Sequence, residues 1–192
     1  MTTTEVRSPR MSLLLGSAVH VVAEHGLRGL THRAVDRQAG LPEGSCSAYL
    51  RTREALVDGV TAYVAERVTA NCHELADELA ATSHDDAQAA ATVTRAILRW
   101  VDEREILVTR LELTIQASRE PRIAATMTAL RQELVGVVAG ILTTRGTAGA
   151  AAAAETLVAS IDGILIGAML RPPGQRKTFV RRAMDVLMAG LG

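Results

Sequence analysis

The sequence predicts an all-α protein, with a three-helix N-terminal domain followed by a longer helical domain and about nine helices in all. Only 2% of the 192 residues are aromatic, while alanine and leucine abound, a composition that favours helix over sheet. No alternating strand pattern of useful length occurs. The five prolines lie at expected helix starts, which helices tolerate: Pro9, Pro42, Pro121, Pro172 and Pro173.

The first helix is expected to begin at Ser8-Pro9, which read as N-cap and first helical position. Apolar residues then recur at helical spacing: Leu14, Leu15, Ala18, Val19 and Val22. Gly26 is expected to end this helix, because glycine readily adopts the left-handed conformation that follows a helix.

Two short helices should follow, separated by a tight turn. Thr31 can cap a helix that runs to Ala39, and Gly40 should stop it. Residues 41–43 restart a third helix that continues to about Leu50. Gly40 supplies the positive φ that a sharp turn requires, so the pair resembles a helix-turn-helix.

The rest of the chain reads as long helices. Thr52, with Glu54 and Asp58 after it, should cap a fourth helix over residues 53–81. Further helices are expected over 86–101, 103–119, 122–145, 147–171 and 175–190, with polar residues, glycine and proline at the joints. We therefore expect domains at residues 1–51 and 52–192.

Charge and cysteine content are consistent with a cytoplasmic protein. The net charge is zero, although residues 1–56 hold seven arginines against five acidic residues, a weak basic excess. Cys46 and Cys72 have no metal or redox spacing, which fits a reducing compartment. The apolar run after Arg10 follows helical periodicity instead of a signal-peptide pattern. Segment 157–170 is too short to span a bilayer, so no membrane partner is expected.

Three stretches resemble the tetracycline-repressor (TetR) family. Residues 14–26 are similar to the family's first helix, and residues 31–45 to its second helix, turn and the opening of its recognition helix. The junction into the fourth helix matches as well: Tyr49-Leu50-Arg51-Thr52-Arg53-Glu54-Ala55-Leu56. The resemblance covers about residues 10–57. It departs at Ser47, where the family usually has Tyr, at Leu50, where it has Phe, and at Arg53, where Lys is more common.

The resemblance implies contacts with double-stranded DNA. Thr31, Thr52 and Arg53 would meet phosphates, as helix N-termini and basic side chains do. Ala48 could touch a thymine methyl group. Glu43 could accept a hydrogen bond from a cytosine or serve only the helix dipole. The full expected DNA-binding set is Thr31, His32, Arg33, Pro42, Glu43, Gly44, Ser45, Ser47, Ala48, Tyr49, Thr52 and Arg53.

The longer domain is expected to provide dimer contacts and an effector pocket. Ala159, Gly163 and Gly167 fall on one helix face beside Ile164, where small residues allow close helix approach, either to a second copy or within the chain. Polar groups on a mostly apolar stretch could converge on a ligand or be ordinary surface charges: Trp100, Arg110, Glu112 and Gln116.

No catalytic motif, metal-ligand spacing or cofactor loop is recognisable, so we expect neither an enzyme nor a cofactor. The family resemblance implies a homodimeric repressor that binds a palindromic operator and is released by a small apolar or mixed-polarity effector. The alternative is a helical interaction module, or a small-molecule-binding protein, without DNA binding.

Overall fold

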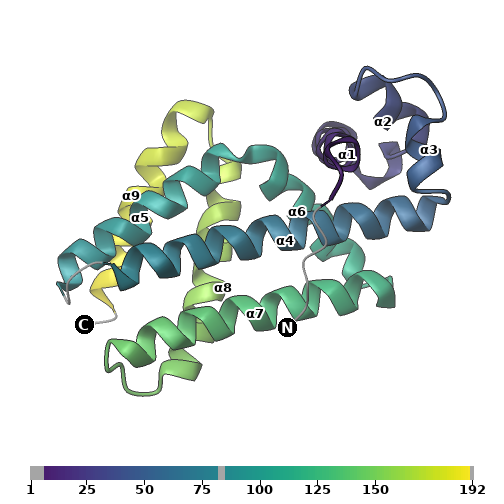
Figure 1. Ribbon diagram of the computed structural model, residues 1–192. Coiled ribbons are helices and arrows are strands. Elements are labelled where there is room, and N and C mark those ends of the chain that lie inside the picture. Colours follow the sequence, from purple (N-terminus) through teal and green to yellow (C-terminus); the bar gives the residue numbers. More distant parts are fainter. Residues whose placement is uncertain (1–6, 82–84, 191–192) are drawn as a thin grey trace. The chain divides into compact units, whose positions relative to one another are not determined.

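The computed structural model describes residues 7–81 and 85–190, and these residues form nine helices and no strand (Figure 1). The all-α prediction is therefore confirmed. The helices are α1 (Pro9–Gly29), α2 (His32–Gln38), α3 (Ser45–Tyr49), α4 (Arg53–Ala80), α5 (Asp86–Asp102), α6 (Arg104–Ala117), α7 (Pro121–Thr144), α8 (Ala150–Met169) and α9 (Pro173–Ala189).

Glycines with positive φ explain where the predicted helix boundaries were wrong. Gly26 has φ 65° and ψ 176° but only kinks α1, which continues to Gly29. Helix α3 begins four residues after Leu41, because Gly44 adopts φ 94° before it. Gly149, with φ 66°, likewise delays the start of α8 from residue 147 to residue 150. The other helix ends lie within two residues of prediction.

The chain divides into two compact units. The first contains residues 1–66 and 108–127, and the second contains residues 67–107 and 128–192. The first unit thus holds the three short N-terminal helices, the start of α4 and the joint between α6 and α7. It extends further along the chain than the expected domain of residues 1–51, and the functional boundary at residue 51 stays a prediction.

The core of the first unit is built on α1, whose Leu14, Ala18 and Val22 are fully buried. Buried side chains from every other helix of the unit complete the core: Val35, Cys46, Leu56, Val60, Leu113 and Ile123. The buried Thr109 hydroxyl of α6 donates a hydrogen bond of 3.1 Å to the Val19 carbonyl of α1. Helix α6 therefore contacts the first helix directly.

The second unit is held together by apolar packing. Helices α5, α8 and α9 pack around one cluster of buried residues, to which the start of α6 adds Leu107: Ile97, Val101, Leu107, Leu165, Ala168, Val180 and Met184. A smaller cluster joins α4 to α5 through Leu75, Leu79, Ala89 and Ala96. Trp100 packs against both clusters. Exposed ion pairs add to this packing at the surface, among them Lys177–Asp102 at 2.7 Å.

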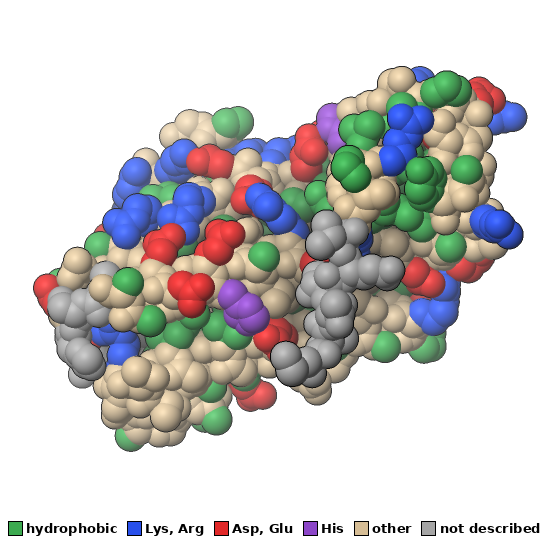
Figure 2. All heavy atoms as spheres, in the orientation of Figure 1, with side chains coloured by type: hydrophobic (Ala, Val, Ile, Leu, Met, Phe, Trp, Pro, Cys, Tyr) green, Lys and Arg blue, Asp and Glu red, His purple; other side chains and the backbone are tan. Residues whose placement is uncertain are grey.

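Helices α7 and α8 carry much apolar surface. Each is long and apolar enough to cross a membrane, but core helices of soluble proteins can have the same length and composition. In the most apolar 18-residue stretch of each helix, only 11% of the residues in α7 and 28% of those in α8 are buried. On the face of the protein shown in Figure 2, basic side chains lie beside acidic ones, in keeping with a net charge of zero.

Candidate DNA-binding site

The turn between α2 and α3 depends on two glycines. Gly40 has φ 66° and Gly44 has φ 94°, conformations that cost other residues energy because of their Cβ atom. The Leu41 amide donates to the Asp36 carbonyl at 2.9 Å and so closes the end of α2. The predicted role of Gly40 in a tight turn is confirmed by its positive φ.

Asp36 fixes the position of α3 from the buried side of α2. Its side chain is almost fully buried. One carboxylate oxygen accepts from the Gly44 amide at 2.9 Å and the other from the Cys46 amide at 2.7 Å. These amides stand at the N-terminus of α3, where helix N–H groups have no partner inside the helix. Asp36 thus joins the two helices without occupying the exposed face of α3.

Sequence reasoning missed this role of Asp36. The signal was an acidic residue directly beside the apolar Ala34 and Val35, in a short helix that precedes a glycine turn. An acidic residue that must be buried needs hydrogen-bond partners, and the first amides of the next helix, which have no partner inside that helix, can supply them. The spacing from Asp36 to Gly44 and Cys46 could have indicated this contact.

Two further side chains brace the helix ends. His32 lies with Nε2 2.5 Å from the Leu50 carbonyl at the end of α3. Arg53 donates to the Leu30 carbonyl at 2.5 Å and to the Leu27 carbonyl at 2.8 Å. The guanidinium of Arg53 is therefore engaged with the end of α1, whereas the family resemblance implied a phosphate contact for it.

The remaining predicted DNA contacts lie around an open surface. Arg33 and Glu43 form an ion pair at 3.6 Å, with side chains 82% and 75% exposed. Ala48 is exposed on α3, and Tyr49 beside it is 48% exposed. The Ser47 hydroxyl donates to the Gly44 carbonyl at 3.1 Å. A shallow depression is lined by residues of α2 and the turn: Thr31, His32, Arg33, Asp36, Glu43, Gly44 and Ser47.

Thr31 and Thr52 cap the helices on which this surface is built. The Thr31 hydroxyl accepts from the Ala34 amide at 3.2 Å, and the Thr52 hydroxyl accepts from the Ala55 amide at 3.0 Å. Both threonines are exposed. Pro42 is exposed in the turn, and Ser45 is half-buried at the first position of α3. The structure thus gathers all twelve predicted residues around α2, α3 and the start of α4.

Two ionisable groups in this region have shifted pKa values. Burial, followed by the negative charge of Asp36, raises the pKa of the Cys46 thiol from 9.0 to about 11. At neutral pH the thiol is therefore protonated and unreactive. The pKa of Glu54 is lowered by its own backbone amide first, then by the Thr52 hydroxyl and the guanidinium groups of Arg122 and Arg53. A carboxylate in the first turn of α4 also suits the helix dipole.

The four predicted effector-pocket residues are divided between the two units, and their role in a pocket stays a prediction. Trp100 belongs to the core of the second unit, whereas Arg110, Glu112 and Gln116 belong to the first unit. Gln116 lines a cleft of the first unit. A separate groove of about 340 Å³ in the second unit contains none of the four and is formed by α4 and α7: Ala76, Asp77, Leu79, Ala80, Val137, Gly140, Ile141, Thr144 and Arg145.

The predicted dimer residues have different surroundings along α8. Ala159 and Gly163 are exposed, and a side chain added at Gly163 would meet nothing within 4 Å. At Gly167, in contrast, an added Cβ would lie 3.0 Å from the ring of Phe179 in α9. Gly167 therefore serves close packing within the chain. Ile164 is half-buried against the core of its unit.

Solved structures with a similar fold include bacterial and archaeal regulators. A transcriptional regulator from Rhodococcus sp. Rha1 has a TM-score of 0.77 at 20% identity, covering 94% of this chain and 95% of that one. The fatty acid degradation regulator FadR from Bacillus halodurans has a TM-score of 0.78 at 13% identity, covering 97% and 98%. A TetR transcription regulator from Haloarcula marismortui has a TM-score of 0.73 at 16% identity, covering 96% and 99%.

The family of this chain is shown by a match to a protein-family model. No curated protein sequence matches the chain, and structural likeness at such low identity shows the fold alone. The model of the tetracycline repressor-like C-terminal domain, however, matches residues 84–190, more than half of the chain. This match lies outside the N-terminal stretches that resemble the same family in sequence, so the two findings are independent. The chain belongs to the TetR family of transcriptional regulators.

Proposed function

We propose that this protein is a cytoplasmic repressor that binds a palindromic operator as a homodimer and is released by a small molecule. The DNA-binding part of this proposal rests on how α3 is held in place. Asp36 holds its first amides from the buried side, while Ala48 and Tyr49 stay exposed on the helix. A rigid helix with a free outer face is what major-groove recognition requires.

Within this proposal the side chains have distinct tasks. Thr31 and Thr52 stand at helix N-termini, which attract phosphate. Arg33 provides a positive charge at the surface, partly balanced by Glu43. Arg53 acts mainly by holding α1 against the start of α4. Base recognition then falls to the exposed residues of α3 and to Glu43.

The dimer is proposed from the exposed apolar surfaces of α7 and α8. Most of the apolar stretch of each helix is not fully buried in the single chain, and exposed apolar surface can mark an interaction site in a soluble protein. A second copy of the chain would cover it through Ala159 and Gly163, whose small side chains permit close helix approach. Two recognition helices could then reach half-sites about 34 Å apart.

The effector is proposed to bind in the second unit. The groove between α4 and α7 has a volume of about 340 Å³, within the range of small-molecule sites. Its walls are mostly aliphatic, with Asp77 and Arg145 as charged groups. An apolar or mixed-polarity molecule suits this lining. An effector releases DNA only if it binds the DNA-free conformation more tightly.

The test of DNA binding is a mobility shift with purified protein and the DNA upstream of its own gene, at several salt concentrations. We expect a specific shift that Tyr49→Ala abolishes and that Arg33→Ala weakens, lowering the salt slope by about 1 if Arg33 contacts a phosphate. Arg181→Ala, an exposed change in α9, is the matched control. Failure to shift any genomic fragment would favour the helical interaction module.

The dimer is tested separately by sedimentation. Gly163→Arg should convert the dimer to monomer, because a long charged side chain would enter the helix contact. Ala70→Arg, at an exposed position of α4, should leave the dimer intact. A Gly163→Arg protein that remains dimeric would place the interface elsewhere, without affecting the DNA-binding proposal.

A further inference from the structure

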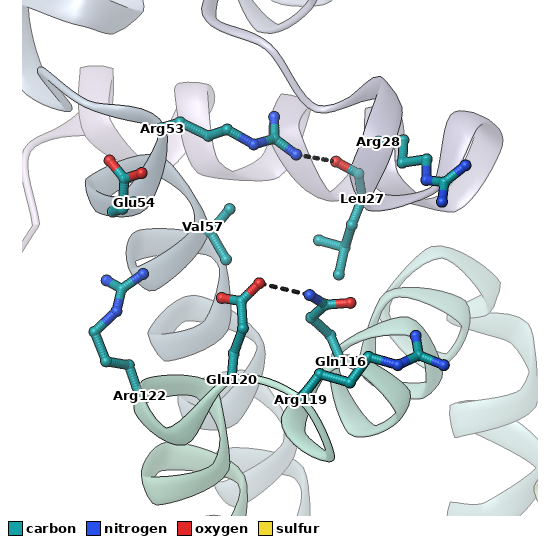
Figure 3. A pocket seen from close by; sticks show the side chains of 9 residues that line it. All are labelled: Leu27, Arg28, Arg53, Glu54, Val57, Gln116, Arg119, Glu120 and Arg122. Carbon is teal, nitrogen blue, oxygen red and sulfur yellow. Dashed lines mark hydrogen bonds between the residues drawn. The ribbon is translucent and has the colours of Figure 1, made fainter.

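The first unit contains a cleft that the proposed function does not use. It has a volume of about 340 Å³ and lies between the end of α1, the first turns of α4 and the joint of α6 with α7 (Figure 3). We call it the arginine cleft. Its lining is Leu27, Arg28, Arg53, Glu54, Val57, Gln116, Arg119, Glu120 and Arg122. Leu27 and Val57 give it an apolar inner surface, as Figure 3 shows.

The cleft holds four arginines against two glutamates, and only some of the arginines are engaged. Arg53 donates to the Leu27 carbonyl at 2.8 Å. Arg122 pairs with Asp58 at 2.5 Å and lies on the side of Glu54 (Figure 3). Both guanidinium groups are therefore committed within the protein.

The other two arginines of the cleft are Arg28 and Arg119. Neither guanidinium group has an ion-pair or hydrogen-bond partner among the described residues. They come from different segments, the last turn of α1 and the turn between α6 and α7. In Figure 3 both lie on the side of the cleft away from Arg122 and Glu54. Unpaired guanidinium groups at the edge of a cleft with an apolar interior fit the chemistry of a carboxylate joined to an apolar group.

The glutamates of the cleft restrict the charge of the ligand. Glu120 accepts from the Gln116 side chain at 2.5 Å, and its negative charge stays inside the cleft (Figure 3). Glu54, with its lowered pKa, is ionised at neutral pH. A single negative charge can sit on the side of the cleft that holds Arg28 and Arg119, whereas a second charge deeper in the cleft would face these carboxylates. The cleft therefore favours a monoanion over a dianion.

We propose that the arginine cleft binds a small organic monocarboxylate, with its carboxylate on the side of the cleft that holds Arg28 and Arg119 and its apolar body on Leu27 and Val57. This site is distinct from the groove between α4 and α7. A bound ligand would connect the end of α1 to the α6–α7 turn, beside the first turn of α4. On the proposed function, that connection couples the cleft to DNA affinity, and the coupling must be reciprocal.

Binding is tested first without DNA. The ¹⁵N-labelled full chain is titrated with cyclohexanecarboxylate, whose ring matches the aliphatic interior, and with the uncharged cyclohexanecarboxamide. We expect saturable shifts of the Arg28, Val57 and Arg119 amide signals with the acid alone. Inorganic phosphate, largely a dianion at pH 8, should bind more weakly. No saturable shift, or equal binding of the amide or of phosphate, would overturn the proposal.

Variants then locate the site. Arg28→Gln and Arg119→Gln should each weaken binding about tenfold, the loss expected for one charge-assisted hydrogen bond. Both side chains are exposed and unpaired, so the fold should persist, which circular dichroism checks. Arg181→Gln is the matched control. Unchanged binding in both cleft variants would place the ligand elsewhere and contradict the proposal.

The regulatory part is measured with DNA. Cyclohexanecarboxylate should change the midpoint of the mobility shift for the wild-type protein and have no such effect on the Arg28→Gln variant. If the protein binds no DNA, the titration without DNA still decides whether the cleft binds a carboxylate. If the protein binds both DNA and cyclohexanecarboxylate but neither changes the affinity for the other, the proposed coupling is wrong, while the proposed binding site is still supported.

Discussion

The two compact units achieve rigidity in different ways. In the first unit, specific polar contacts set the positions of short helices: Asp36 on the amides of α3, His32 on the Leu50 carbonyl, and Arg53 on the end of α1. In the second unit, long helices enclose apolar clusters, and its ion pairs are largely exposed. A short helix buries too little apolar surface to fix its own orientation, so polar contacts take over that task.

Loss of Asp36 should be the most damaging single change in this comparison. Asp36→Ala removes two charge-assisted hydrogen bonds and leaves the Gly44 and Cys46 amides unsatisfied, at a cost of about 3 kcal/mol in the free energy of unfolding. Asp36→Asn keeps one acceptor and should lose less. Denaturant unfolding followed by circular dichroism measures both. If Asp36→Ala unfolds like the wild type, the polar contacts do not hold α3.

Alkaline pH should weaken the first unit through Cys46. Its pKa is about 11 in the folded protein against an ordinary value of 9.0. The stability associated with the protonated thiol is therefore complete below pH 9 and declines as the pH rises towards 11, by about 2–3 kcal/mol in total. Cys46→Ala should remove this part of the decline while costing some stability at pH 7 from lost packing.

The check is the difference between the two unfolding free energies, measured from pH 8 to pH 11 so that other titrating groups cancel. Parallel curves for the wild type and Cys46→Ala would contradict the assignment of a raised pKa to this thiol.

The same substitution should have opposite effects in the two units. Gly44→Ala places a Cβ at φ 94° and should destabilise the first unit by about 1–2 kcal/mol. Gly174→Ala lies in the first turn of α9 with open space around it and should stabilise that helix by up to about 1 kcal/mol, because alanine is the better helix former. Thermal unfolding at one fixed protein concentration compares them. If both substitutions changed the free energy of unfolding in the same direction, the proposed contrast between the units would be wrong.

The smallest effect is expected at the surface of the second unit. Asp102→Ala breaks the ion pair with Lys177, whose side chains are 59% and 49% exposed, and should change the unfolding free energy by less than about 0.5 kcal/mol. Added salt should reduce even this difference. A loss comparable to that of Asp36→Ala would mean that ion pairs matter equally in both units.

Local signals in the sequence predicted the fold well. Ser8 before Pro9 and Thr52 before the fourth helix both mark caps that the structure contains, and Gly40 marks the turn. These features act within a few residues and need no tertiary information. The start of α3 was predicted too early because a proline followed by an acidic residue also begins many helices, and only the positive φ at Gly44 sets the actual start.

Contacts between distant segments could not be predicted in the same way. The arginine cleft joins residues of α1 and α4 to residues around position 120, and nothing near Arg28 in the sequence indicates Arg119. Gly167 belongs to a stripe of small residues with Ala159 and Gly163, yet of the two glycines only Gly167 lies close to Phe179. Equal spacing along a helix gives residues a common face, while the neighbouring helix decides what each one meets.

Trp100 gives the protein an intrinsic optical probe. It is the sole tryptophan of the chain and packs half-buried against both apolar clusters of the second unit, whereas both tyrosines, Tyr49 and Tyr63, belong to the first unit. Tryptophan emission therefore reports on the second unit alone. Compared with circular dichroism, which detects all helices, it will show whether the two units unfold as one cooperative body or in succession.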